Sequence, residues 1–231
     1  MFKKYFYLVR HGETILNAEH KRQGSEGGLS ENGKQQVVKI TEILKHIKIQ
    51  KIFCSPFERT RETLEIINKV LQIPENKIIF TPLLAERKNP AEIIGKSYDD
   101  PIVQNFIDTL DKSFQNPDLR LTNEENFIDL RNRALGCQKY LINEGKNKNL
   151  CVTHGIFLKM FLAALLYGPN LSASDYIKIS EYNPAHNAAL TLISYDSLKN
   201  FMNKIFFRNP YTNPKNNPWE ILVYNYLVKN S

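Results

Sequence analysis

Cysteine is scarce in this sequence, and no apolar run is long. The 231-residue chain has three cysteines, Cys54, Cys137 and Cys151, an odd number without a C-x-x-C pair. This pattern argues against a disulfide framework and against a thiolate zinc site, so we expect buried and unreactive thiols. The apolar run at 157–167 contains a lysine and is shorter than the roughly 20 residues that a membrane-spanning helix needs.

The sequence also lacks a secretory signal. Only five apolar or aromatic residues, Tyr5 to Val9, stand between the N-terminal lysines and Arg10, too few for the apolar core of a signal peptide. No small-residue cleavage site follows them. We therefore expect a cytoplasmic protein without a membrane partner.

Acidic residues are outnumbered, most of all in the first quarter of the chain. The formal net charge is +7, and residues 1–61 alone contain 12 Lys and Arg against 6 Asp and Glu. Such a field favours an anionic partner. No basic run and no zinc-finger spacing accompanies the charge, which disfavours nucleic acid. A small phosphorylated or carboxylated substrate fits the same surplus.

Short apolar runs alternate with amphipathic stretches along the chain, without internal repeats. This alternation is typical of an α/β fold. We expect strands at about 5–10, 51–54, 149–153, 187–196 and 219–228. The predicted fold class is a three-layer α/β/α sandwich around a mostly parallel sheet, with a helical cap insertion.

Three helices have recognisable ends. One follows Ser30, its expected N-cap, and has apolar residues at helical spacing as far as residue 47. A second follows Ser55, which we interpret as an N-cap because a proline and the glutamate of a capping box come after it. This helix carries Arg59 in its first turn. A third, over 156–167, is largely apolar and is closed by a Gly-Pro pair.

We expect one domain over residues 1–231. Residues of about 87–135 are polar and helical in tendency, with little strand pattern, and we interpret them as a cap over a site. The segment 206–219 contains three Asn-Pro steps, and a residue that precedes proline disfavours helix. We therefore predict a long surface loop over about 197–218.

Charged and imidazole side chains follow three of the expected strands directly. They lie at Arg10-His11, between Ser55 and Arg59, and at His154. Ligands of open α/β sheets bind at the carboxyl ends of strands, so we expect these turns to form one site. Guanidinium groups match phosphate oxygens, and a neutral imidazole is a nucleophile at pH 7, so the chemistry predicted is phosphoryl transfer.

A metal site is a weaker interpretation of the two histidines. No nearby carboxylate or third histidine has suitable ligand spacing. We therefore expect no metal and no other cofactor.

An ordered set of motifs now resembles a known family, the histidine phosphatase superfamily in its phosphoglycerate-mutase-like branch. The resemblance covers about residues 5–195. It rests on these motifs, in chain order: LVRHGET with Asn17, RQG at 22–24, LSENG with Gln36, CSPFERTRETL, LAER at 84–87 and VTHG ending at Gly155.

The resemblance implies a role for each matching residue. His11 matches the nucleophile that becomes a phosphohistidine, and Glu86 matches the general acid. Arg10 and Arg59 match the clamps on the phosphate, joined by His154. The positions that border phosphate or substrate correspond to Gly12, Thr14, Asn17, Gln23, Gly24 and Gly155. Arg61 lies two residues beyond the clamp position and is interpreted as a solvated charge or as one that lies behind the residues contacting the phosphate.

The sequence departs from the family pattern in ways that favour a phosphatase over a mutase. After Glu86 the chain reads RKNPAEIIGKS, where many relatives have a glycine and a W-E-G-like stretch. True cofactor-dependent mutases carry tryptophans where this chain has Ser25 and Leu16. The expected function is therefore a metal-independent phosphomonoesterase for a small phosphorylated metabolite, working through phospho-His11. A phosphoglycerate-type mutase and a non-catalytic phosphate-binding module are the alternatives. The oligomeric state stays open.

Overall fold

One mixed sheet forms the centre of the molecule. The computed structural model describes residues 3–115, 124–206 and 216–228, and these contain six strands in the order β3-β2-β4-β1-β5-β6. The strands are β1 (Lys3–Arg10), β2 (Lys51–Cys54), β3 (Ile78–Phe80), β4 (Lys148–Thr153), β5 (Leu190–Asp196) and β6 (Trp219–Tyr226). The first four in chain order are mutually parallel, and β5 is antiparallel to both β1 and β6.

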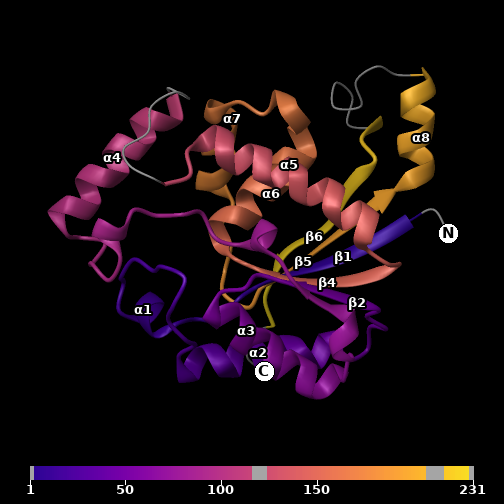
Figure 1. Ribbon diagram of the computed structural model, residues 1–231, viewed down its shortest axis with the longest axis horizontal. Helices are drawn as coiled ribbons and strands as arrows, with labels where there is room; N and C mark the ends of the chain where they lie inside the picture. The colour runs from indigo at the N-terminus through magenta and orange to yellow at the C-terminus, as the bar shows by residue number, and fades with distance from the viewer. Residues whose placement is uncertain (1–2, 116–123, 207–215, 229–231) are drawn as a thin grey trace.

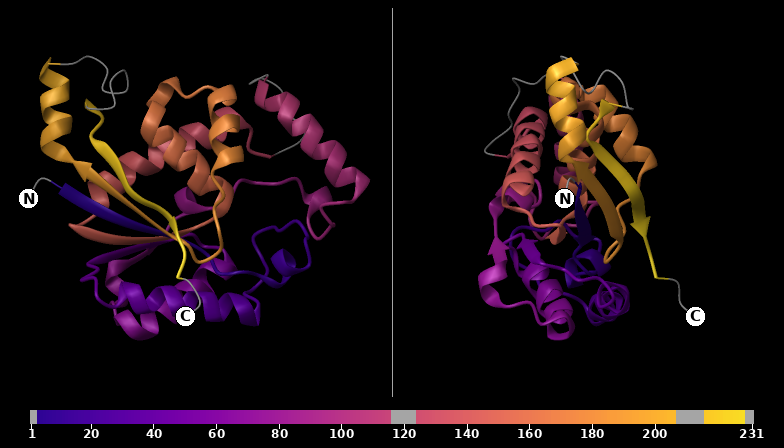
Figure 2. Two further views of the ribbon diagram at one scale, coloured as in Figure 1. Left: turned by 180° about the vertical axis from the view of Figure 1, so that it is seen from behind. Right: turned by 90° about the vertical axis from the view of Figure 1, so that its right-hand side faces the viewer.

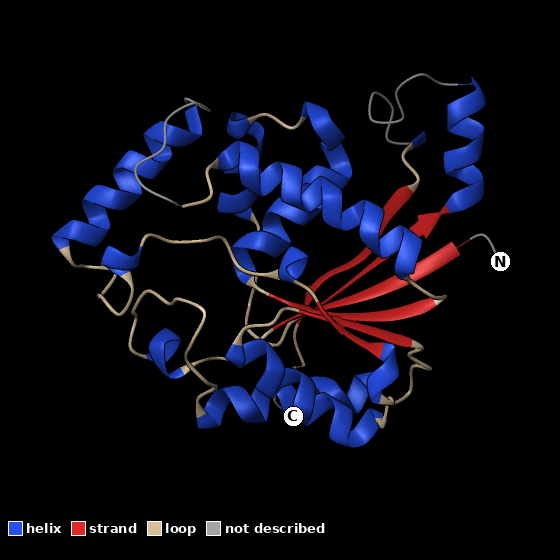
Figure 3. Ribbon diagram, in the orientation of Figure 1, coloured by secondary structure: helices blue, strands red, loops and turns tan. Residues whose placement is uncertain are grey.

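Helices cover both faces of this sheet. The helices are α1 (Ile15–Ala18), α2 (Glu31–Leu44), α3 (Glu58–Leu71), α4 (Pro101–Gln115), α5 (Phe127–Glu144), α6 (Gly155–Tyr167), α7 (Ala173–Tyr182) and α8 (Ser197–Phe206). Short 3₁₀ turns lie at Glu75–Lys77, Pro82–Leu84, Ala91–Ile93 and Gly168–Asn170. Helices α2 and α3 lie on one side of the sheet and α5, α6 and α7 on the other (Figures 1 and 3). The predicted three-layer α/β/α class is confirmed.

The apolar run in β1 is explained by burial on both faces. Phe6 and Leu8 belong to the core cluster that contains the buried side chains of α5 and α6. Tyr7 and Val9 belong to the second cluster, with the buried side chains of α2 and α3. Because successive side chains of a strand point to opposite faces, a central parallel strand is apolar at every position.

The parallel strands end side by side. In the register, Arg10 at the end of β1 is opposite Thr153, and Cys54 at the end of β2 is opposite Val152. β1 runs from right to left in Figure 1, so these carboxyl ends face the side on which α1 and α4 lie. The view from behind in Figure 2 has the same two helices together at that end of the sheet.

Of the two predicted serine caps, one is confirmed and one is wrong. The Ser30 hydroxyl accepts a hydrogen bond from the N–H of Gly33 at 3.0 Å and caps α2. Helix α3 begins at Glu58 after an extended Phe57 that makes no side-chain cap. The Ser55 hydroxyl instead lies 2.7 Å from Nε2 of His154, so the serine serves the strand-end turn rather than the helix.

The predicted cap boundary at residue 135 falls inside a core helix. Helix α5 runs on to Glu144 and buries Leu130, Ala134 and Leu141 against the same cluster as α6. Its first half therefore belongs to the core. The part of the predicted cap that stands apart contains the turn Ala91–Ile93 and helix α4 (Figure 1).

The predicted loop over 197–218 is wrong in its first part. Residues 197–206 form α8, and their apolar positions 198, 201, 202 and 205 have helical spacing. The Asn-Pro steps do not prevent this helix, because all three come after it in the chain. Residues 207–215 lie outside the described residues. Within the described ranges, no helix combines the length and apolarity needed to cross a membrane.

Candidate active site

The three predicted turns meet at the carboxyl ends of β1, β4 and β2. Arg10 is the last residue of β1 with His11 after it, Arg59 is in the first turn of α3, and His154 precedes α6. A cavity of about 340 Å³ opens there. Its lining includes Arg10, His11, Asn17, Arg22, Gln23, Arg59, Glu86, Asn89, Tyr98, Gly155 and Lys159.

His11 is held as a neutral imidazole with a defined tautomer. Its Nδ1 lies 2.7 Å from the carbonyl oxygen of Gly12. A carbonyl can only accept, so Nδ1 carries the proton and Nε2 keeps its lone pair. Burial lowers the pKa of His11 well below its usual value, and the charges of Arg10 and Arg59 lower it further. The ring therefore stays neutral at pH 7, and the lone pair on Nε2 is available for nucleophilic attack.

His154 lies behind Arg59 rather than in the wall of the cavity. Nε of Arg59 donates to its Nδ1 at 3.2 Å, and its Nε2 lies 2.7 Å from the Ser55 hydroxyl. Because a guanidinium only donates, Nδ1 is the acceptor and the Nε2–H donates to Ser55. Burial and the neighbouring Arg59 lower the pKa of His154 well below its usual value. The ring thus orients Arg59 as a neutral group.

Arg59 is a buried cation and Arg10 a half-buried one, and neither has a carboxylate partner among the described residues. Nη1 of Arg59 donates to the carbonyl of Gly24 at 2.8 Å, and Nη1 of Arg10 donates to that of Ala185. Nε of Arg10 has no hydrogen-bond partner in the described chain. Burial lowers the pKa of Arg59 to about 10, which leaves it charged at neutral pH. Such a pair is suited to an anion.

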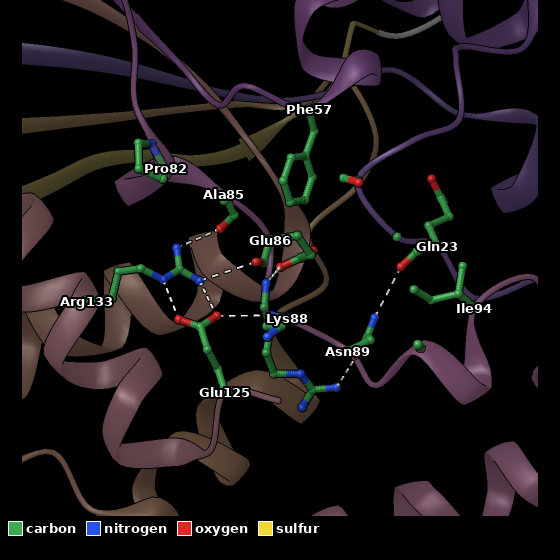
Figure 4. Close-up of a pocket in the computed structure, with 14 residues that line it drawn as sticks. Gln23, Phe57, Pro82, Ala85, Glu86, Lys88, Asn89, Ile94, Glu125 and Arg133 are labelled. Atoms are coloured by element: carbon green, nitrogen blue, oxygen red, sulfur yellow. Dashed lines mark hydrogen bonds and ion pairs between the residues drawn. The ribbon is translucent and has the colours of Figure 1, made fainter. Parts of the chain in front are cut away.

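Glu86 is anchored at the N-terminus of α6. Its carboxylate accepts from the N–H groups of Ile156 at 3.1 Å and Phe157 at 2.9 Å, and from that of Arg87 at 2.9 Å. A surface ion pair with Arg87 or Lys88 is therefore not its main interaction. Figure 4 shows Glu86 between the ring of Phe57 and Lys88. The carboxyl group lies in the wall of the same cavity as His11.

The cavity is lined by three of the predicted binding residues, Asn17, Gln23 and Gly155. Gly24 contributes its carbonyl, which accepts from Arg59. The other two, Gly12 and Thr14, do not line the cavity. Gly12 is where the chain approaches α2, since a Cβ there would lie 2.5 Å from the carbonyl oxygen of Gly33. Thr14 caps α1 by accepting from the N–H of Asn17. Arg61 is exposed and donates to the carbonyl of Pro56, away from the site, as predicted.

A match to a family model identifies the superfamily of this chain. The model of the histidine phosphatase superfamily, branch 1, matches residues 6–206. The chain belongs to this superfamily.

Individual members of the histidine phosphatase superfamily match to different extents. A protein of Escherichia coli named probable phosphoglycerate mutase GpmB is 47% identical over 62 residues, 26% of this chain and 29% of that protein. A counterpart from Erwinia tasmaniensis with the same name is 44% identical over 62 residues. The match thus spans less than a third of these relatives.

Solved structures match over nearly the whole chain. YhfR of Bacillus stearothermophilus is 27% identical with a TM-score of 0.69, covering 84% of this chain and 92% of its own. The α-ribazole phosphatase of Shigella flexneri has a TM-score of 0.74 at 18% identity, covering 98% of this chain and 100% of its own. The latter likeness concerns the fold.

In this member of the histidine phosphatase superfamily, sequence reasoning missed four polar residues of the cavity. Arg22, Asn89, Tyr98 and Lys159 line it. The signal for Lys159 was available, because it lies four residues after Gly155 on the same face of a helix. Arg22 and Tyr98 lie in loops without regular structure, and no local pattern brings these loops together.

A second cavity adjoins the first. It measures about 520 Å³ and shares Gln23, Glu86 and Asn89 with it. Phe57 and Ile94 supply apolar surface, and an ion pair between Arg133 and Glu125 closes one side (Figure 4). Within the described residues, no group of three or more His, Cys, Asp or Glu side chains could hold a metal ion.

Proposed function

We propose that the protein is a phosphomonoesterase that works through a phosphohistidine on His11. One observation carries the proposal: a neutral His11 with a free Nε2 lines the same cavity as Arg10, Arg59 and Glu86. These are the parts that phosphoryl transfer needs, namely a nucleophile, charges for the phosphate oxygens and a proton donor. A pure phosphate-binding module needs neither the nucleophile nor the acid.

The first step forms a covalent intermediate. Nε2 of His11 attacks phosphorus with its lone pair, and the bond from phosphorus to the leaving oxygen breaks. Arg10 and Arg59 stabilise the charge on the equatorial oxygens, with His154 orienting Arg59. Glu86 donates its proton to the leaving oxygen, which departs as an alcohol.

The second step restores the enzyme. Glu86, now a carboxylate, accepts a proton from a water molecule that attacks phosphorus. The bond from phosphorus to Nε2 breaks, and inorganic phosphate leaves. Every charge in both steps is supplied by side chains, so we propose that no metal is required.

The leaving group is proposed to be a small metabolite. The second cavity begins at Glu86 and gives room for an alcohol larger than the phosphate itself. The turn Ala91–Ile93 and α4 are proposed as its cover. A mutase is the second candidate, favoured by the name of the Escherichia coli relative; it would return the phosphoryl group to substrate.

Hydrolysis of aryl phosphates in EDTA tests this proposal. Wild type, His11→Ala and Glu86→Gln are assayed with phenyl phosphate and 4-nitrophenyl phosphate near pH 6. We expect activity in EDTA, its loss in His11→Ala, and a loss in Glu86→Gln of about 10²–10⁴-fold that is larger for phenyl phosphate, the poorer leaving group. Arg61→Gln is the matched control and should keep the wild-type rates.

Two results would contradict the proposal. Full activity in His11→Ala would remove the nucleophile from the mechanism. A wild type that releases no phosphate from any ester, but transfers label from one phosphorylated metabolite to another, would make the protein a mutase.

A further inference from the structure

The charge of the main cavity exceeds what one phosphate requires. Its lining holds four cations, Arg10, Arg22, Arg59 and Lys159, and one carboxylate, Glu86. The balance is three positive charges. A phosphate monoester brings two negative charges at most, and Arg10 and Arg59 suffice to hold them. Arg22 and Lys159 are left without an assigned partner.

Arg22 is a buried cation with an unsatisfied donor. It is only 8% exposed, and its Nε has no hydrogen-bond partner among the described residues. Its guanidinium lies over the ring of Tyr98, 4.4 Å from the centroid. A buried guanidinium without an anion costs free energy, and its stacking on Tyr98 leaves the edge of the fork available.

The backbone around Arg22 is fixed. Its N–H donates to the carbonyl of Lys96 at 2.9 Å, and its carbonyl accepts from the N–H of Gly95 at 2.9 Å. The loop that carries Arg22 is therefore tied to the segment that carries Tyr98. The side chain is held toward the cavity before any ligand arrives, which lowers the entropy lost on binding.

Lys159 approaches the cavity from α6. It lies one turn beyond Gly155, and its Nζ donates to the carbonyl of Ser180 at 2.7 Å. An ammonium has three donors, so this bond does not exhaust it. Burial and Arg10 lower the pKa of Lys159, and burial lowers the pKa of Arg22; Glu86 opposes the shift in both cases. The charge of Glu86, the proposed proton donor, therefore acts on both Arg22 and Lys159.

Neither cation has an ion-pair partner in the described ranges. We infer that Arg22 and Lys159 bind a second anionic group, a carboxylate or a phosphate, on the alcohol part of the substrate. The inference rests on the proposed phosphatase function and names its substrate class: small phosphate esters with an anionic group at the far end. Arg22 and Lys159 are then the residues that determine specificity.

The experiment compares esters of the same length. Propyl phosphate, 2-carboxyethyl phosphate and propane-1,3-diyl bisphosphate are assayed with wild type, Arg22→Gln, Lys159→Gln and the double variant. We expect kcat/KM of the wild type to be about 10-fold or more higher for one of the anionic esters, equal to about 1.4 kcal/mol. That preference should fall in each single variant and approach unity in the double variant. Arg61→Gln is the matched control with the same change of charge.

Three outcomes on the esters would overturn the inference. The first is equal kcat/KM for the three esters in wild type. The second is a preference that survives in the double variant. The third is a fall in rate that is the same for all three esters, as a purely structural role on Tyr98 would cause. The better of the two anionic esters distinguishes a carboxylate from a phosphate.

A binding measurement separates this inference from the proposed function. Propylphosphonate, 2-carboxyethylphosphonate and propane-1,3-bisphosphonate, which cannot be hydrolysed, are titrated calorimetrically into wild type and Arg22→Gln. If no ester is hydrolysed, the phosphatase proposal fails, and the titration alone decides the second subsite. Tighter binding of the carboxylated phosphonate or of the bisphosphonate than of propylphosphonate, lost in Arg22→Gln, supports it. Equal affinity for the three phosphonates overturns it.

Discussion

Two buried histidines in the same site are held in opposite tautomers. His11 has its proton on Nδ1 because that nitrogen faces the carbonyl of Gly12, whereas His154 has its proton on Nε2 because Nδ1 faces Arg59. Each partner can play only one role in a hydrogen bond, so each tautomer is determined by its neighbour. The free lone pair on Nε2 of His11 and the orientation of Arg59 both depend on this arrangement.

The tautomers can be observed directly. In ¹⁵N-histidine spectra of the wild type at pH 7.5, we expect Nδ1–H for His11 and Nε2–H for His154. Ser55→Ala leaves the Nε2–H of His154 without its acceptor, and should lower the free energy of unfolding by about 1–3 kcal/mol in urea titrations. An imidazolium signal from either ring at pH 7.5, or a fully stable Ser55→Ala variant, would contradict the assignment.

At the scale of elements, periodicity predicted the strands and the helices with long apolar patterns. β1, β2, β4, β5, β6, α2, α3 and α6 are all present within a few residues of their predicted positions. β3 was missed because it has only three residues. The motifs identified His11, Arg59 and Glu86 as candidate site residues. Arg22 and Tyr98 are brought together only by tertiary packing, which no local sequence pattern predicts.

Two glycines in helices should respond oppositely to a methyl group. At Gly33 in α2, a Cβ would lie 1.9 Å from the carbonyl oxygen of Glu13, in the turn beside His11. Gly33→Ala should cost about 1–3 kcal/mol or more of unfolding free energy. At Gly136 in α5, a Cβ would meet no described atom within 4 Å, and Gly136→Ala should stabilise by about 0.5–1 kcal/mol. Urea titrations of both variants beside wild type check this pair. A Gly33→Ala variant as stable as Gly136→Ala would mean that α2 does not pack closely against the carbonyl of Glu13.

At the scale of the whole molecule, burying neutral histidines makes stability depend on pH. The pKa of both His11 and His154 is lowered in the folded state by burial and by nearby arginines. The unfolded chain titrates near the ordinary value of about 6.5. Above that pH neither state binds the proton, and below it only the unfolded chain does, until the pH reaches the folded pKa. Stability is therefore lost as pH falls below about 6.5.

The loss of stability below pH 6.5 should be steep, and a mutation of His11 should reduce it. Each buried neutral histidine contributes up to about 1.4 kcal/mol per pH unit to the slope of unfolding free energy below pH 6.5. His11→Asn, whose amide can still donate to Gly12, should reduce the slope of the wild type by about that amount between pH 6 and 5. Urea titrations at several pH values measure both slopes. Parallel curves for wild type and variant would show that His11 is not buried as a neutral group.

The strand order also bears on how the chain folds as it is made. β4 lies between β1 and β2 in the sheet, yet it begins only at Lys148, long after β2 ends at Cys54. During synthesis, the first two strands leave the ribosome without their common neighbour. β2 can pair with β3, which follows it, but β1 has no native strand partner until β4 is made. His154 directly follows β4, so the strand that joins β1 to β2 also brings this histidine to the site. The nascent chain thus lacks His154 until more than half of it has been translated.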